Sequence, residues 1–182
     1  MALVVLLRGV NVGGHRTFRP STLSRQLSHL DAVSIGAAGT FVIRRPVSRM
    51  LLRAEFTRRL PFEAEIAICQ GREIAALLSH DYFRDQRLRS DMVRFVSVLT
   101  RASRTAPTLP LRMPSTGPWL VKVLAREHRV VVGLYRRQMK TIGYLRGLDR
   151  VFGVPVITRN WKTMAAIADV LGGGLSPVSH QP

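Results

Sequence analysis

The chain has 182 residues, of which 46% are hydrophobic and 21% are charged, and this balance excludes wholesale disorder. Its length suits one large domain or two small lobes, and no apolar run approaches the roughly 20 residues that a membrane helix needs. Lys and Arg total 28 against 11 Asp and Glu, a formal charge of +17, and the single cysteine, Cys69, excludes an internal disulfide and a cysteine zinc cage.

The first 80 residues predict the order strand, helix, strand, strand, helix, strand. The continuous apolar run over 3–7 is typical of a strand buried on both faces. Pro20 opens a helix, because proline suits the first helical position. Strands follow over 32–36, 40–44 and 65–69, with a helix over 47–60 and a short helix over 71–80. This order is that of the split βαβ, ferredoxin-like arrangement.

The second half repeats this order without its first helix. Strands are predicted over 93–99, 119–124, 130–135 and 155–158, and helices over 142–151 and 161–171. Four prolines between 101 and 118 make a helix there improbable. We therefore predict an α+β fold with two ferredoxin-like lobes over 1–80 and 91–171, a proline-rich connection over 101–118 and a frayed tail over 172–182.

The positive charge is carried almost entirely by arginine. Only Lys122, Lys140 and Lys162 are lysines, and the other 25 basic residues are arginines spread along the chain. The planar guanidinium suits phosphate, and nucleic acid is the common polyanion of the cytoplasm. Drift of a genome toward arginine codons is the alternative explanation of the same composition.

A glycine-rich loop follows the first predicted strand, with the sequence Gly9-Val-Asn-Val-Gly-Gly-His-Arg16. His15 and Arg16 stand where a nucleotide phosphate loop needs lysine and a hydroxyl, so that motif is excluded. Backbone N–H groups at Gly13 and Gly14 could still face an anion flanked by Arg8, His15 and Arg16. The alternative is a tight connection that uses glycine for its positive φ.

A second basic motif, Thr158-Arg-Asn-Trp-Lys-Thr163, precedes the last predicted helix. Asn160 is a good N-cap. Arg159 and Lys162 lie where the helix dipole is positive and cations are normally disfavoured. An anion bound between them would explain these two positive charges. The alternative is a cap, a Trp161 side chain packed into the core and two solvated cations.

Catalytic and metal-binding patterns are sparse. The zinc-protease, serine-hydrolase and paired-cysteine signatures are missing from the sequence, and no metal site is predicted. Cys69 lies in an apolar strand, where a thiol is typically an inert core residue. His15 is the one candidate proton carrier, so whether the protein is an enzyme, and with which cofactor, stays open.

Together, the two motifs resemble the bacterial family named domain of unknown function 1697. The resemblance spans nearly the whole chain and implies two α+β, ferredoxin-like lobes, with no established activity, substrate or cofactor. Members usually carry a Gln-Ser-Gly-Asn turn before the third strand, whereas this chain has Ala37-Ala38-Gly39-Thr40. A polar site built on that turn in other members would lack its glutamine, serine and asparagine side chains here.

Two functional hypotheses follow, besides a structural or protein-interaction role. The first is a cytoplasmic protein, with no membrane association, that binds nucleic acid or another polyanion through arginine-rich surfaces. The second is a small enzyme or sensor for a phosphorylated or carboxylated metabolite, held between the Gly13–His15 loop and the Arg159–Lys162 helix start. The candidate anion-binding residues are Arg8, Asn11, Gly13, Gly14, His15, Arg16, Arg159, Asn160 and Lys162. The sequence does not indicate an oligomeric state.

Overall fold

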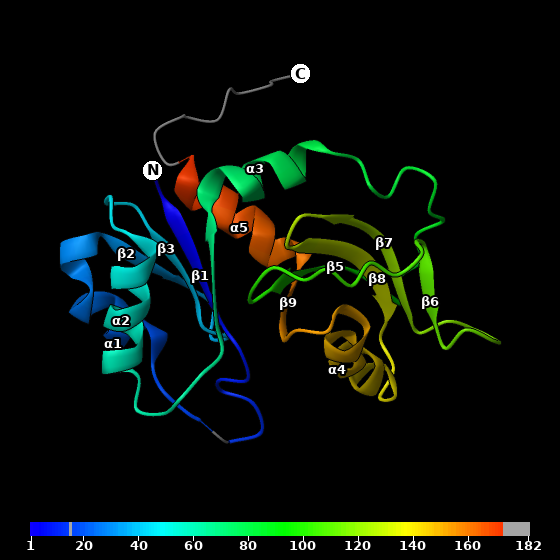
Figure 1. The fold of residues 1–182 in the computed structure, drawn as a ribbon, viewed down its shortest axis with the longest axis horizontal. Coiled ribbons are helices and arrows are strands. Elements are labelled where there is room, and N and C mark those ends of the chain that lie inside the picture. The colour runs from blue at the N-terminus through cyan, green and yellow to red at the C-terminus, as the bar shows by residue number, and fades with distance from the viewer. Residues whose placement is uncertain (15, 173–182) are drawn as a thin grey trace.

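The structure is a computed structural model that describes residues 1–14 and 16–172 (Figure 1). This part of the chain forms two antiparallel β-sheets, of four and five strands, and five α-helices. The predicted α+β class is therefore confirmed, whereas the predicted tail lies, after Gly172, outside the described residues. Within those ranges, no helix is long and apolar enough to cross a membrane.

The first sheet has the strand order β2-β3-β1-β4, and every neighbouring pair is antiparallel. Its central strand β1 is buried at all five positions, as the apolar run predicts. The elements of this half, in chain order, are β1 (Leu3–Leu7), α1 (Pro20–Gln26), a 3-10 turn (Ser28–Leu30), β2 (Ala32–Ile35), β3 (Thr40–Ile43), α2 (Arg49–Arg59), β4 (Ile66–Gln70) and α3 (Gly71–Ser79).

The second sheet has the order β6-β7-β8-β5-β9, again with antiparallel neighbours. Residues 101–118, all of which are described, contain no helix, as the prolines predict, but they do contain the unpredicted edge strand β6. The elements are β5 (Met92–Leu99), β6 (Leu111–Met113), β7 (Val121–Glu127), β8 (Val130–Arg136), α4 (Thr141–Phe152), β9 (Val156–Asn160) and α5 (Trp161–Leu171).

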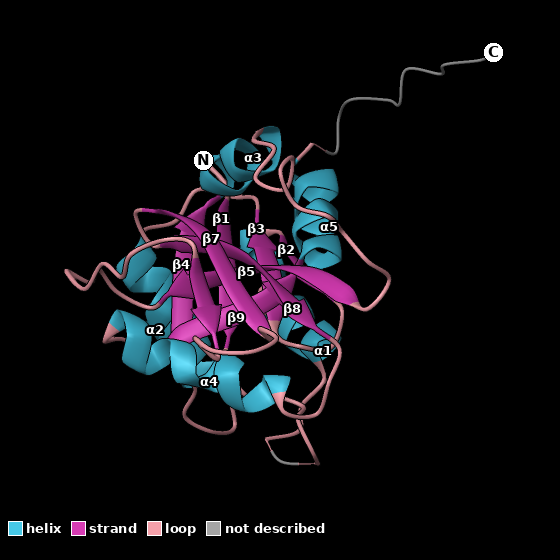
Figure 2. Cartoon of the chain, turned by 90° about the vertical axis from the view of Figure 1, so that its right-hand side faces the viewer, coloured by secondary structure: helices cyan, strands magenta, loops and turns pink. Residues whose placement is uncertain are grey.

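Helices cover the outer faces of both sheets, and a shared core joins the halves. Helices α1 and α2 lie on the first sheet, α4 lies on the second, and α3 and α5 pack against each other between the two (Figures 1 and 2). The central core contains Leu6 from β1, Val96 from β5 and Met164 from α5, all fully buried. Burial of apolar surface, at about 25 cal/mol per Å², therefore holds the halves together.

The turn between β2 and β3 packs closely against the end of β1. Gly39 has a φ of +78°, and a Cβ atom built there would lie 2.8 Å from both Leu7 Cβ and Val10 Cγ2. The Gly39 carbonyl also accepts a hydrogen bond of 2.8 Å from the Leu7 N–H. Glycine at this position thus permits both the left-handed backbone and the contact with β1.

We predict that Gly39→Ala lowers the free energy of unfolding by about 3 kcal/mol, because the added methyl group overlaps Leu7 and Val10 in addition to straining the backbone. Gly36→Ala is the matched control. Gly36 has a φ of +60° but open space around its Cβ position, so its loss is only about 1–2 kcal/mol. Urea denaturation measures both, and equal losses would contradict the close approach.

Candidate functional site

Arg159, at the end of β9, reaches out of the second half and binds the first. Its Nη2 donates to the carbonyl oxygens of Leu7 and Ala38, both at 2.6 Å, and its Nε donates to Thr40 Oγ1 at 2.9 Å. Its Nη1 donates to the Thr158 carbonyl at 2.9 Å. The two sequence motifs thus meet at Arg159, but every nitrogen of this guanidinium already has an oxygen partner.

Arg159 is half-buried and its guanidinium nitrogens are bound to protein oxygens, so it differs from both the solvated cation and the anion ligand of the two sequence interpretations. Burial lowers its pKa to about 10, so the side chain remains charged at neutral pH. Carbonyl and hydroxyl dipoles, in place of a carboxylate, balance the buried charge. Arg159 is a structural contact between the two halves.

The loop after β1 is also held by internal contacts. Asn11 Nδ2 donates to the Ala37 carbonyl at 2.7 Å, and Asn11 Oδ1 accepts from the Phe18 N–H at 2.9 Å. Arg8 pairs with Asp149 of α4 at 2.7 Å. Asn11 and Arg8 thus have partners within the chain.

Positive φ angles run through this loop, as the tight-connection interpretation predicts. Gly13 and Gly14 have φ angles of +58° and +75° and are exposed. Their neighbour His15, the predicted proton carrier, lies outside the described residues. Arg16 lines an open hollow of about 760 Å³ that also contains Glu63 and Glu65, two carboxylates that disfavour an anion there.

The second motif divides between two places. Asn160 Oδ1 accepts from the Thr163 N–H at 2.9 Å, which confirms the predicted N-cap. Trp161 packs against the central core. Lys162, in contrast, lies away from the Arg159 contacts, in a separate hollow of about 330 Å³ with Arg94 and Arg137, which we call the α5 hollow.

Cations that lie far apart in the sequence come together on one face of the second sheet. In strand register, Arg112 of β6 pairs with Lys122 of β7, Lys122 with Leu134 of β8, and Leu134 with Arg94 of β5. These residues thus form one row across four strands, about 14 Å long at the usual strand spacing. Arg136, two residues beyond Leu134, points to the same face. We call Arg94, Arg112, Lys122 and Arg136 the cationic face.

Aromatic rings support three of these cations. The Arg136 guanidinium lies 4.7 Å from the Trp119 ring centroid, and Lys122 Nζ lies 5.9 Å from the same ring. Arg94 lies 5.8 Å from Trp161. Such contacts are attractive and hold long side chains in defined positions.

Residues 80–91, here called the strap, cross this face between its cations. Phe83 is buried in the core with Arg94 at 5.6 Å from its ring, and Gln86 Oε1 accepts from Lys122 Nζ at 2.7 Å. Burial and the charge of Arg112 lower the pKa of Lys122. Two like charges therefore lie close together here without a carboxylate between them in the described structure.

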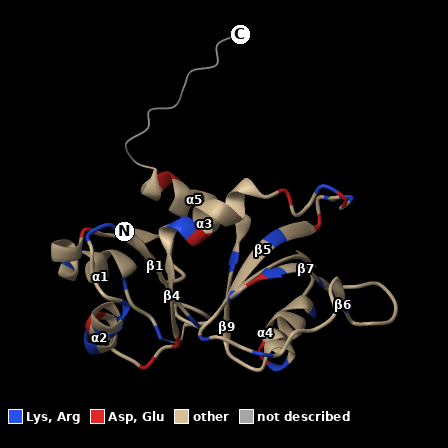
Figure 3. Ribbon diagram, turned by 45° about the horizontal axis from the view of Figure 1, so that its top comes forward, with Lys and Arg blue, Asp and Glu red and all other residues tan. Residues whose placement is uncertain are grey.

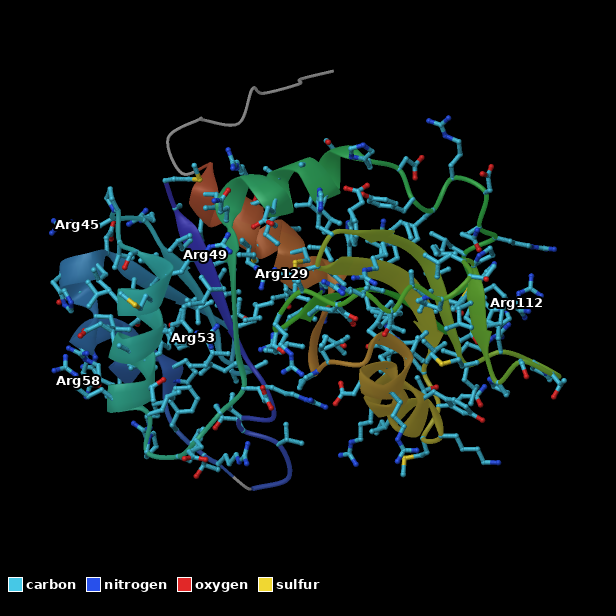
Figure 4. All side chains as sticks on the ribbon, viewed as in Figure 1. Arg45, Arg49, Arg53, Arg58, Arg112 and Arg129 are labelled. Atoms are coloured by element: carbon cyan, nitrogen blue, oxygen red, sulfur yellow. The ribbon has the colours of Figure 1, made fainter. Side chains whose placement is uncertain are left out.

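The cationic face lies at one end of the molecule. Basic residues far outnumber acidic ones along the described chain, and several lie on β5 and around β7 (Figure 3). Arg112 is at the outer edge of the second sheet, on the opposite side from Arg58 of α2 and from Arg45, which precedes α2 (Figure 4). A ligand on this face would therefore not reach those two arginines.

Groups for nucleophilic or metal chemistry are not assembled in the described residues. Cys69 is 1% exposed, and burial raises the pKa of its thiol to about 12, so its thiolate is scarce at neutral pH. Within residues 1–14 and 16–172, no cluster of three or more His, Cys, Asp or Glu side chains could hold a metal ion.

Comparisons with known proteins identify a family and a fold. The family model described as "Protein of unknown function (DUF1697)" matches residues 1–118. Among solved structures, the chain is similar to the conserved bacterial protein SP0830 from Streptococcus pneumoniae, with a TM-score of 0.60 and 17% identity, over 93% of this chain and 98% of that one. A comparison with curated proteins gave no match.

We predict that Arg159→Met lowers the free energy of unfolding by about 2–4 kcal/mol, because the carbonyls of Leu7 and Ala38 lose their donor. Lys162→Met, at an exposed position of the same motif, changes it by less than about 0.5 kcal/mol. Urea denaturation of both variants checks this. Equal free energies of unfolding for the two variants would show that Arg159 does not join the halves.

We predict that Cys69 reacts with a thiol reagent at pH 8 only when the protein unfolds, because the native thiol is buried and protonated. Labelling followed by mass spectrometry should be slow in buffer and rapid in denaturing urea. Fast labelling of the native protein would mean that β4 opens locally or that the thiol has another environment.

Proposed function

We propose that this chain, which belongs to the family of Protein of unknown function (DUF1697), binds nucleic acid through the cationic face. The observation that supports this most is the row of Arg112, Lys122 and Arg94 across the second sheet. One carboxylate, that of Asp91, pairs with this face in the described chain, at 3.3 Å from Arg136. Such a surplus of unneutralised cations attracts a polyanion.

Phosphate is the anion that this surface suits best. Arginine presents a planar fork of N–H donors that matches phosphate oxygens, and lysine adds a point charge. Arg94 and Arg112 are exposed, so their guanidinium groups are accessible to a ligand. The strap adds the exposed Arg84, Arg87 and Arg89, of which Arg84 pairs with the exposed Asp81 at 3.7 Å.

The aromatic contacts favour nucleic acid over other polyanions. Because Trp119 fixes Arg136 and Trp161 fixes Arg94, these guanidinium planes are positioned before a ligand binds. An arginine plane can stack on a base as well as contact a phosphate. A sulfated polysaccharide has no such π-surface, so it would use only the charges.

The hypothesis of a metabolite site between the two motifs has less support. Arg159 and Asn11 are bound to the backbone, and Arg8 is paired with Asp149. Gly13 and Gly14 remain exposed, but Lys162 lines a different hollow. We therefore prefer the cationic face as the functional surface, and a cytoplasmic location would give it access to nucleic acid.

We also infer that the halves are two ferredoxin-like lobes, over residues 1–80 and 91–171. The order β2-β3-β1-β4 is repeated as β7-β8-β5-β9, with β6 added at the edge of the second sheet. Both orders are those of a split βαβ unit with antiparallel neighbours. In this interpretation, the cationic face lies on the side of the second sheet opposite α4, beyond the part that packs against α5.

We predict that a single-stranded oligonucleotide binds with an affinity that falls by about two to three decades between 50 and 200 mM salt, because about six phosphates are neutralised and each contributes about 0.7 to the slope on a single strand. The double variant Arg112→Gln/Lys122→Gln should lower the slope of log affinity against log salt by about 1.4, which is about 0.7 for each lost contact on a single strand. Fluorescence anisotropy measures both quantities.

The charge-matched control is Arg45→Gln/Arg58→Gln, at the opposite side of the molecule (Figure 4). It should leave the slope nearly unchanged. A flat salt profile, or the same loss of slope in both double variants, would contradict binding at the cationic face. Equal displacement by heparin and by an oligonucleotide of matched charge would indicate a general polyanion surface instead.

A further inference from the structure

The α5 hollow brings together three cations from three different elements. Arg94 comes from β5, Arg137 follows β8, and Lys162 lies in the first turn of α5, and all three are exposed. The hollow measures about 330 Å³, which is within the usual size range of small-ligand sites. Elements far apart in the sequence therefore place their positive charges around one concave space.

No carboxylate lines this hollow in the described structure. The nearest acidic residue in sequence, Asp91, directs its carboxylate to Arg136 at 3.3 Å, while its backbone carbonyl accepts from the Arg137 N–H at 2.8 Å. Three like charges around one space repel each other unless an anion lies among them. A ligand with two negative charges offsets this repulsion better than one with a single charge.

The walls of the hollow are in part apolar and fixed in position. Trp161 packs edge-to-face on Phe83 with ring centroids 5.1 Å apart, and Met92 and Val93 supply a second wall. Arg94 lies 5.8 Å from the Trp161 ring. The space can thus take a compact charged group together with the sugar or base attached to it.

The hollow also lies where the cationic row ends. Arg94 is the last cation of the row. The next strand, β9, pairs with β5 only as far as the Phe95–Asn160 pair, and the chain continues from Asn160 into α5. The strap crosses the row between Lys122 and Arg94, so a polyanion that reaches the hollow from Arg112 passes over the strap. The phosphate group at the end of a phosphorylated strand is a monoester, which carries a charge of about −1.5 to −2 at pH 7. Each internal phosphate is a diester and carries a single negative charge.

We propose that the α5 hollow binds a phosphate monoester in its dianionic form. The monoester is either the terminal phosphate of a strand on the cationic face, which rests on the proposed function, or the phosphate of a free nucleotide. Arg137 and Lys162 contact its oxygens, and Arg94 is shared between the hollow and the row.

The test compares oligonucleotides of one sequence with a 5′-phosphate, a 3′-phosphate or only hydroxyl ends, by anisotropy at pH 8. A terminal phosphate should tighten binding about tenfold, on the order of one charge-assisted contact pair. Arg137→Gln and Lys162→Gln should abolish this preference and change the affinity of the hydroxyl-ended strand less than twofold. Lys140→Gln, an exposed lysine outside the hollow, should keep the preference.

The dependence on pH supplies a second readout. Because the second pKa of a phosphate monoester is about 6, the preference should shrink when the pH falls from 8 to 5. A preference that is constant over this range would overturn the dianion proposal.

The outcomes separate this proposal from the proposed function. If the hydroxyl-ended strand binds and a terminal phosphate adds nothing, the α5 hollow is overturned while the cationic face stands. If no strand binds but adenosine 5′-monophosphate does so in a Lys162-dependent way, the hollow is supported with a free nucleotide as its ligand, and the proposed function fails. If neither binds, both are overturned.

Discussion

A half-buried guanidinium that binds main-chain oxygens joins the two halves beside their shared apolar core. Arg159 extends from β9 to Leu7, Ala38 and Thr40 of the first half, and the fit of the glycine turn against β1 keeps these acceptors in position. Beside this contact, the first half and α5 cover part of the second sheet. The rest of the same face carries the cationic row, which the strap crosses between Lys122 and Arg94.

Arginine has two distinct roles in this protein. Some guanidinium groups complete the backbone hydrogen bonding. Arg53 and Arg129 donate to the Ile66 and Ile68 carbonyls of the edge strand β4, at 3.1 and 2.6 Å, and Arg126 binds the proline-rich segment. Such side chains also protect a sheet edge from pairing with another chain. Others, such as Arg94 and Arg112, are exposed and lie beside further cations. The net charge therefore overestimates the number of cations that are available for binding, because some of the arginines have a structural role.

Much of the fold could be predicted from local pattern. The boundaries of α5 and its Asn160 cap, the buried strand β1 and the helix over 142–151 follow from periodicity and capping chemistry, which are local. The role of Arg159 could not be predicted, because its partners lie about 120 and 150 residues away along the chain. The cationic row could not be predicted either. Its cations become neighbours only through the register of four strands, and they are Arg94, Arg112 and Lys122. One of these strands, β6, lies in the proline-rich segment, where the sequence pattern does not predict a strand.

The three lysines allow one direct measurement of where nucleic acid binds. Lys122 lies in the cationic face, Lys162 in the α5 hollow, and Lys140 at the start of α4, outside both. Acylation of each lysine can be followed by mass spectrometry with and without a saturating hydroxyl-ended oligonucleotide. The account predicts that the oligonucleotide slows the acylation of Lys122 severalfold and leaves Lys140 unchanged. Binding that protects Lys140 while Lys122 reacts at its free rate would contradict it.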